Sequence, residues 1–180
     1  MIGLYDDSDS NLFQITALRN ITIRTSGADT INGGGIIGMS TGSDQNTFNQ
    51  TSIDDSYVYS SGLVYGGAVF GLDDSTLNNV SGLNITNVSA DIQSTVFGAG
   101  IFGLEDSSAS NTFRRIRIVN STAGIATSVY GGGILGARSS SSANIYDNMT
   151  IENCSVEIGN SIFGGGAFGL RTSSGSNQIT

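Results

Sequence analysis

The sequence predicts an all-β protein built as a parallel β-helix, or β-solenoid, and three observations lead to this prediction. Glycine clusters of one form open at Gly33, Gly66, Gly98, Gly131 and Gly164, so they recur after 33, 32, 33 and 33 residues. Self-similarity at such an interval is typical of solenoids and other repeat folds. The recurring columns combine β-branched and aromatic residues with Gly, Ser, Asn and Thr, without apolar residues at helical spacing. We therefore expect about five and a half coils of 32–33 residues in a single domain over residues 1–180.

The first extended stretch of each unit runs through the glycine cluster, as in GGAVFGL at 66–72. Glycine weakens a regular strand, so its repetition indicates either a tight corner with unusual backbone angles or a close approach by another backbone segment. Both alternating sets of side chains here are apolar, and alternate residues of a strand point to opposite faces. One set must then face outward. We expect an apolar stripe that meets a partner, formed by Phe70, Phe102, Leu135 and Phe168.

The second stretch carries two columns of asparagine. One precedes a large apolar residue by two positions, as Asn78 precedes Val80, and the other follows an isoleucine by two, as Asn87 follows Ile85. Like side chains stacked at roughly 4.8 Å along a β-helix can hydrogen-bond one another and satisfy the backbone at a corner. We interpret both columns as structural ladders. Their members are Asn46, Asn78, Asn111, Asn144 and Asn177 in the first column and Asn87, Asn120 and Asn153 in the second.

The third stretch is short and places apolar residues two positions apart, such as Ala123 and Ile125. Three extended stretches per unit suit one coil of a solenoid. A propeller blade would need around 40 to 45 residues and hairpin turns, and Asn-Gly or Asp-Gly turns are nearly absent. The β-helix is therefore the better prediction.

Composition excludes several classes of function. The chain has 180 residues, a net charge of −8, no His, no Pro, no Trp and one Cys. Nucleic acid is a poor partner because binding phosphates needs clustered basic residues. Without His, the common catalytic triads and His-containing metal sites cannot form. We expect no cofactor and no metal centre, and we interpret Cys154 as a small buried residue.

The ends of the chain show no capping repeat, and no stretch has the 18 or more apolar residues of a membrane span. A solenoid with open ends would pair with other chains. We therefore expect either a fragment of a longer array or a protein that stacks end to end.

Three segments carry a resemblance to a known family. GGGILG at 131–136, IENCSV at 151–156 and GGGAFG at 164–169 resemble the GLUG-type repeats of bacterial and protist surface proteins. GGAV at 66–69 is also similar to the repeats of chlamydial polymorphic outer-membrane proteins, although their companion F-x-x-N tetrapeptide does not follow here. The resemblance implies a secreted or surface-displayed β-helical adhesin or stalk, with no catalytic residues to transfer.

The acidic residues after the glycine stretch form the one candidate site for chemistry. Stacking of adjacent units would bring together Asp73, Asp74, Glu105 and Asp106. Such a group could be a solvated structural corner, could hold Ca²⁺, or could supply an acid and a base for cleaving polysaccharides.

Two functions follow from these patterns. The first is a non-enzymatic, extracellular or cell-surface repeat protein, an adhesin or stalk segment, whose partner is a protein or glycan ligand or another copy of itself. The second is a polysaccharide-degrading β-helix enzyme that uses the stacked carboxylates.

Overall fold

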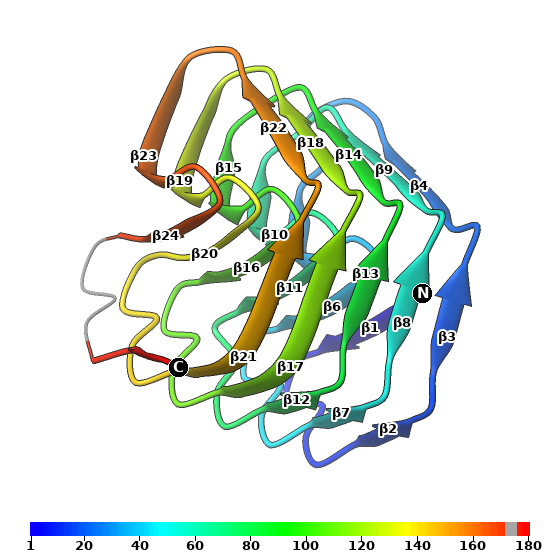
Figure 1. Cartoon of the computed structure of the whole chain (residues 1–180), viewed down its shortest axis with the longest axis vertical. Coiled ribbons are helices and arrows are strands. Elements are labelled where there is room, and N and C mark those ends of the chain that lie inside the picture. The colour runs from blue at the N-terminus through cyan, green and yellow to red at the C-terminus, as the bar shows by residue number, and fades with distance from the viewer. Residues whose placement is uncertain (172–175) are drawn as a thin grey trace.

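The computed structural model describes residues 1–171 and 176–180, and within these ranges it contains strands and no helix. The chain winds into a β-solenoid of about five turns, which confirms the predicted fold class. Figure 1 shows the coils stacked side by side, from the N-terminal coil in blue to the C-terminal coil in red. Each strand pairs in parallel with the equivalent strand of a neighbouring coil. The described residues include no helix that is long and apolar enough to span a bilayer.

Four sheets, named A to D here, run along the solenoid, and the chain crosses them in that order in each coil. Sheet A consists of β1 (Ile2–Tyr5), β6 (Ile37–Ser40), β11 (Phe70–Asp73), β16 (Phe102–Glu105), β20 (Leu135–Ala137) and β24 (Phe168–Leu170). Sheet C consists of β4 (Thr22–Thr25), β9 (Tyr57–Ser60), β14 (Ser89–Ile92), β18 (Thr122–Ile125) and β22 (Ser155–Ile158). Sheet D consists of β5 (Ile31–Gly34), β10 (Val64–Gly67), β15 (Val96–Ala99), β19 (Ser128–Gly132) and β23 (Ser161–Gly165).

Each coil bends in the middle of sheet B. The strands of this sheet are β2 (Leu12–Gln14), β3 (Ala17–Arg19), β7 (Thr47–Asn49), β8 (Ser52–Asp54), β12 (Asn79–Ser81), β13 (Asn84–Thr86), β17 (Thr112–Val119), β21 (Ile145–Glu152) and β25 (Gln178–Ile179). The earlier coils cross sheet B as two short strands, whereas β17 and β21 run through the bend as single longer strands. Residues with left-handed backbone angles lie at the bend, such as Gln50 with a φ of 55° and Arg115 with a φ of 54°. The bend recurs in register, so it turns every coil in the same place.

Aromatic ladders fill the centre of the solenoid. Phe48 stacks on Phe13 with ring centroids 4.6 Å apart, and Phe113 stacks on Tyr146 at 5.2 Å. Phe102 meets Phe113 edge to face at 5.1 Å. Both arrangements are favourable for aromatic pairs. These rings belong to one continuous core that runs from coil to coil.

Sheets D and A meet where the chain folds back through the glycine cluster. Figure 1 shows this at the left, where the chain leaves β23, turns and runs back along β24. Gly98 has a φ of 114°, and a Cβ there would overlap the carbonyl oxygen of Gly66. A Cβ on Gly71 would overlap the backbone of Gly33 and of Gly67. The glycines therefore have both roles that the sequence left open, since the corner needs unusual backbone angles and the two sheets touch through their backbones.

The predicted outward stripe of apolar residues is wrong. Phe70, Phe102 and Leu135 are fully buried, and Phe168 is half-buried and packs against the same core. The fold-back causes the error: the glycine stretch is two strands in different sheets, so the alternation of side chains does not continue across the turn. The aromatic rings that face outward are instead those of sheet D, which comes before the fold-back in each coil.

These outward rings form an aromatic ladder on sheet D. Tyr65, Phe97, Tyr130 and Phe163 stack with successive centroid distances of 5.0, 5.3 and 4.7 Å. The first three are half-buried, and Phe163, in the last complete coil, is 40% exposed. This ladder lies next to the C-terminal ends of the strands of sheet A.

Candidate functional site

Carboxylates of neighbouring coils gather where the strands of sheet A end. Asp73 is the last residue of β11 and pairs in register with Glu105, the last residue of β16. Asp74 and Asp106 follow directly, at exposed positions with left-handed φ angles of 51° and 29°. The structure therefore brings all four residues of the predicted acidic site to one edge of sheet A.

Burial changes the acidity of the two inner carboxyl groups. It raises the pKa of Asp73 to about 6, and the charges of Asp106 and Asp74 raise it further. Burial likewise raises the pKa of Glu105 to about 7, although the Arg138 guanidinium acts in the opposite direction. Values near neutrality are useful in acid–base catalysis, but structural ion pairs also perturb a pKa. A raised pKa therefore does not by itself distinguish a catalytic carboxyl from a structural one, and the contacts of the carboxylates are needed as well.

Glu105 is closed off by an arginine of the next coil. Nη1 of Arg138 donates a hydrogen bond of 2.8 Å to Oε1 of Glu105, which is only 4% exposed. The same guanidinium lies over the ring of Phe97, 4.4 Å from its centroid, and Arg171 lies 4.3 Å from the centroid of Tyr130. A cation over an aromatic face is stabilising. The position that Glu105 occupies in one coil is taken by Arg138 in the next. The two therefore form an ion pair beside the aromatic ladder of sheet D.

The acidic edge does not have the form of a metal site. Within residues 1–171 and 176–180, no three Asp, Glu or Cys side chains are grouped so that they could hold a metal ion. Calcium takes six to eight oxygen ligands, so the geometry of Asp73, Asp74, Glu105 and Asp106 gives no support to the Ca²⁺ interpretation.

The first asparagine column is a buried, hydrogen-bonded ladder. The backbone N–H of Asn78 donates to Oδ1 of Asn111 at 2.8 Å, and that of Asn111 donates to Oδ1 of Asn144 at 2.9 Å. Nδ2 of Asn111 donates to the carbonyl oxygen of Ser75 at 3.1 Å. The equivalent N–H bonds of Asn46 and Asn144 complete the column. The amide oxygens accept from backbone N–H groups at a buried corner, where Nδ2 of Asn78 has no partner among the described residues, and the last acceptor is the half-buried Asn177. The role of this column is structural.

The second asparagine column lies at an exposed corner between sheets B and C. Its residues have left-handed backbone angles, which asparagine tolerates better than most residues. They are Asn87 (φ 55°), Asn120 (φ 50°) and Asn153 (φ 49°). The column is in register because of the backbone turn, and its amides are not buried.

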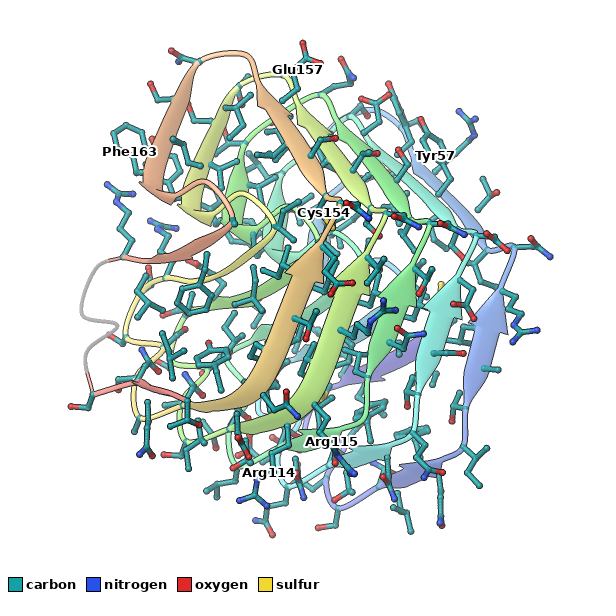
Figure 2. The ribbon with its side chains drawn as sticks, in the orientation of Figure 1. Tyr57, Arg114, Arg115, Cys154, Glu157 and Phe163 are labelled. Carbon is teal, nitrogen blue, oxygen red and sulfur yellow. The ribbon has the colours of Figure 1, made fainter. Side chains whose placement is uncertain are left out.

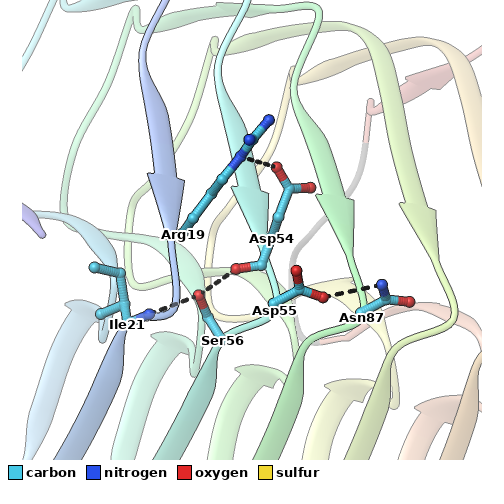
Figure 3. A network of polar contacts seen from close by, with 6 residues as sticks. All are labelled: Arg19, Ile21, Asp54, Asp55, Ser56 and Asn87. Carbon is cyan, nitrogen blue, oxygen red and sulfur yellow. Dashed lines mark hydrogen bonds and ion pairs between the residues drawn. The ribbon is translucent and has the colours of Figure 1, made fainter.

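Figure 3 shows this corner in the earlier coils. Nδ2 of Asn87 donates to Oδ1 of Asp55 at 3.1 Å, which is an exposed contact between Asn87 and the equivalent position of the preceding coil. Beneath it, the hydroxyl of Ser56 accepts from the N–H of Ile21 at 3.1 Å and donates to the carbonyl oxygen of Asp54 at 2.7 Å. The serine therefore satisfies the backbone where the chain turns.

Cys154 takes the place of this serine in the fifth coil. Its Sγ lies 3.2 Å from the carbonyl oxygen of Glu152 and 3.4 Å from that of Ile118. The side chain is half-buried and packs against the core. Figure 2 shows it at the junction of β21 and β22. These contacts are those of a small side chain at a structural turn.

The outer face of sheet C carries a hollow that sequence reasoning missed. Asp91, Gly124 and Glu157 stand in register in consecutive coils, so the middle of this outward column has no side chain. A hollow of about 410 Å³ opens there. The other polar side chains that line it are Tyr57, Ser89, Thr122 and Ser155. Its signal in the sequence is a glycine midway between two acidic residues, each one period away.

Comparisons with protein-family models, with curated proteins and with solved structures find no match for this chain. The resemblance to GLUG-type repeats therefore stays a hypothesis. Function has to be argued from the acidic edge and from the outer faces of the solenoid.

Proposed function

We propose that this chain is a segment of a non-enzymatic repeat protein, an adhesin or structural stalk displayed outside the cell, which presents stacked side chains to a partner. The observation that carries the proposal is the closure of Glu105 by Arg138. The carboxyl group with a pKa nearest neutrality is 4% exposed and is held in an ion pair at 2.8 Å. A general acid or base must come within hydrogen-bond distance of its substrate. The acidic edge is thus better suited to holding coils together than to catalysis.

The rigid frame of the solenoid supports a binding role. Buried ladders such as Asn78 and Asn111 keep successive coils in register, at roughly 4.8 Å per coil. Side chains on the outer faces are consequently held at fixed spacing, which lowers the entropy lost when a partner binds. The hollow over Gly124 is one such outward site. The resemblance to surface adhesins and stalks agrees with this proposal.

A polysaccharide-degrading enzyme is the second candidate, and one observation favours it. Asp73 and Glu105 lie in adjacent coils and both have raised pKa values, with the exposed carboxylates of Asp74 and Asp106 beside them. In an enzyme of this kind, one carboxyl would protonate the leaving group and another would act on the opposite side of the bond.

Incubation with a panel of acidic polysaccharides, with and without Ca²⁺, separates the two candidates. We expect no product above background from the wild-type chain. Turnover that disappears in Asp74→Ala, but persists in Asp29→Ala, would identify an enzyme and refute the proposal. Asp29 is an exposed acid on the loop between sheets C and D, so its variant is a control for lost charge.

Binding is tested with the same chain on immobilised glycans, extracellular-matrix proteins and intact cells. We expect saturable binding to at least one of these surfaces, without turnover of the ligand. Binding that is unchanged after heat denaturation would count against the proposal, because presentation by a folded solenoid requires the coils to be in register.

A further inference from the structure

We propose that the hollow over Gly124 binds the guanidinium group of an arginine side chain from a partner protein, held between the carboxylates of Asp91 and Glu157. This inference rests on the proposed binding function and names the chemistry of the partner. Two observations support it: a hollow on an open face over a glycine that the backbone does not require, and the negative charge of its walls.

Gly124 differs from the glycines of the fold-back. At Gly98 a Cβ would overlap a neighbouring backbone, and the φ angle of 114° is one that other residues avoid. At Gly124 the nearest atom to an added Cβ is the carbonyl oxygen of Ala90, 3.9 Å away, and the φ angle is not in the left-handed region. Glycine inside a strand costs about 0.5–1 kcal/mol relative to alanine. Close approach of a ligand to the backbone is one of the roles of a strand glycine, and it is the one that open space over Gly124 allows.

The walls of the hollow carry negative charge. Asp91 lies on one side of Gly124 and Glu157 on the other, each on the neighbouring coil. The described residues that line the hollow include no arginine, and the chain as a whole has a net charge of −8. A cationic group would therefore find two carboxylates and no competing cation in the lining.

One of the two carboxylates is held by hydrogen bonds from neighbouring side chains, and the other is exposed. Asp91 accepts hydrogen bonds from the hydroxyl of Tyr57 at 3.3 Å and from Nε2 of Gln93 at 2.6 Å. Glu157 is exposed, and within the described residues its carboxylate has no hydrogen bond or ion pair. Figure 2 shows Glu157 and Tyr57 projecting from the outer side of the solenoid. Asp91 is thus preorganised for a ligand, and the longer side chain of Glu157 can reach the same ligand by a change of rotamer without a shift of the backbone.

The spacing favours guanidinium over ammonium. Two strand separations place the backbones of Asp91 and Glu157 about 10 Å apart. A guanidinium that donates to a carboxylate on each side spans about 8 Å between the two oxygens, whereas a tetrahedral ammonium spans about 4.6 Å. A sugar would rely on stacking against an aromatic ring, but the ring of Tyr57 already has Arg24 over it at 5.4 Å. The hollow therefore suits an arginine side chain better than a lysine or a glycan.

The probe is a synthetic peptide, acetyl-Gly-Gly-Arg-Gly-Gly-amide, titrated into the isotope-labelled chain and followed by NMR. Matched peptides carry citrulline, which keeps the shape and removes the charge, or lysine. We expect saturable shifts of the backbone amides of Gly124, Asp91 and Glu157 with a Kd of about 1 mM, since a single side chain provides all of the affinity. The citrulline peptide should cause none, and the lysine peptide should bind at least three-fold more weakly.

Variants of the hollow test the assignment of each wall. Asp91→Asn and Glu157→Gln should each weaken binding about ten-fold, whereas Asp29→Asn removes the same charge elsewhere and should change it less than two-fold. Gly124→Gln should abolish binding by filling the hollow. Gly124→Arg should also abolish binding and should raise the melting temperature above that of Gly124→Gln, because the new guanidinium reaches the two carboxylates from within. The open space over Gly124 allows both variants to fold.

Three results would overturn the inference: equal binding of the citrulline peptide, full binding by Gly124→Gln, or shifts at Gly124 caused by a neutral oligosaccharide such as cellohexaose in place of the arginine peptide. The outcome is distinguishable from that of the proposed function. If the arginine peptide fails while the chain still binds surfaces without turnover, only this inference fails. If the chain cleaves polysaccharides, the proposed function fails whatever the peptide does.

Discussion

Arg138 reaches from one coil to the next and donates a 2.8 Å hydrogen bond to Glu105, with its guanidinium over the ring of Phe97. The pair is well enclosed, since the side chain of Arg138 is 23% exposed and that of Glu105 is 5% exposed. Removing one partner of an enclosed pair leaves an uncompensated charge, which costs far more than losing an exposed pair. This ion pair therefore makes the acidic edge sensitive both to mutation and to pH.

Arg138→Met should lower the free energy of unfolding by roughly 3 kcal/mol at pH 7.5, and by less at pH 5, where Glu105 can take up a proton. Urea unfolding at the two pH values measures both effects. Arg114→Met is the control, because Arg114 and Asp147 form an exposed pair at 3.8 Å that should contribute less than 1 kcal/mol. Equal losses at both pH values would contradict the assignment of Glu105 as the partner.

The stability of the wild-type chain should carry a component that falls as the pH rises from about 3.8 to about 7. The pKa values of Asp73 and Glu105 are raised on folding, from 3.8 to about 6 and from 4.5 to about 7. In this window the folded state keeps protons that the unfolded state has released, so a rise in pH favours unfolding. The double variant Asp73→Asn, Glu105→Gln should lack this component, because neither replacement side chain titrates. Parallel pH profiles of the two proteins would refute the prediction.

Asn111→Ala should destabilise the chain by roughly 2–4 kcal/mol, because it leaves the N–H of Asn78 and the carbonyl oxygen of Ser75 buried without their partner. Asn120 is the matched control from the exposed column, where Asn120→Gly should change stability by less than about 1 kcal/mol since glycine accepts the same backbone angle. Thermal unfolding compares the two. Similar effects would mean that the two columns do not differ as described.

Phe102→Ala should cost about 3–5 kcal/mol, as expected for removing a fully buried ring that touches Phe70 and Phe113. Phe97→Ala removes a ring of the outward ladder and should cost roughly 1–2 kcal/mol. Circular dichroism and urea titration measure the difference. An unchanged midpoint for Phe102→Ala would restore the outward orientation that the sequence predicted.

Gly98→Ala should prevent folding or destabilise the chain severely, because its Cβ would overlap Gly66 and its φ angle is 114°. Gly124→Ala has open space and an ordinary φ angle, so it should be neutral or should stabilise by about 0.4–1 kcal/mol. The melting temperatures of the two variants decide between these expectations. A strongly destabilising Gly124→Ala would show that the glycine has a backbone role after all.

Period and register could be predicted from the sequence alone. Glycine clusters 32 or 33 residues apart and an asparagine at one place in each unit imply stacked equivalent coils, and the pairing of Phe70 with Phe102 has that register. The acidic edge could be predicted for the same reason, because residues one period apart become neighbours. In a solenoid each coil contacts only the neighbouring coils, so the period of the sequence also specifies which residues are in contact.

The direction of the side chains depended on the three-dimensional fold. The fold-back at Gly66 and Gly98 interrupts the strand, so Phe70 turns inward although alternation within one continuous strand allowed it to face out. Whether an asparagine is buried, like Asn111, or sits at an exposed turn, like Asn120, depends on where each coil bends. A repeat period specifies which residues stack on one another. It does not specify which side of the coil they occupy, because backbone angles at the corners set that orientation.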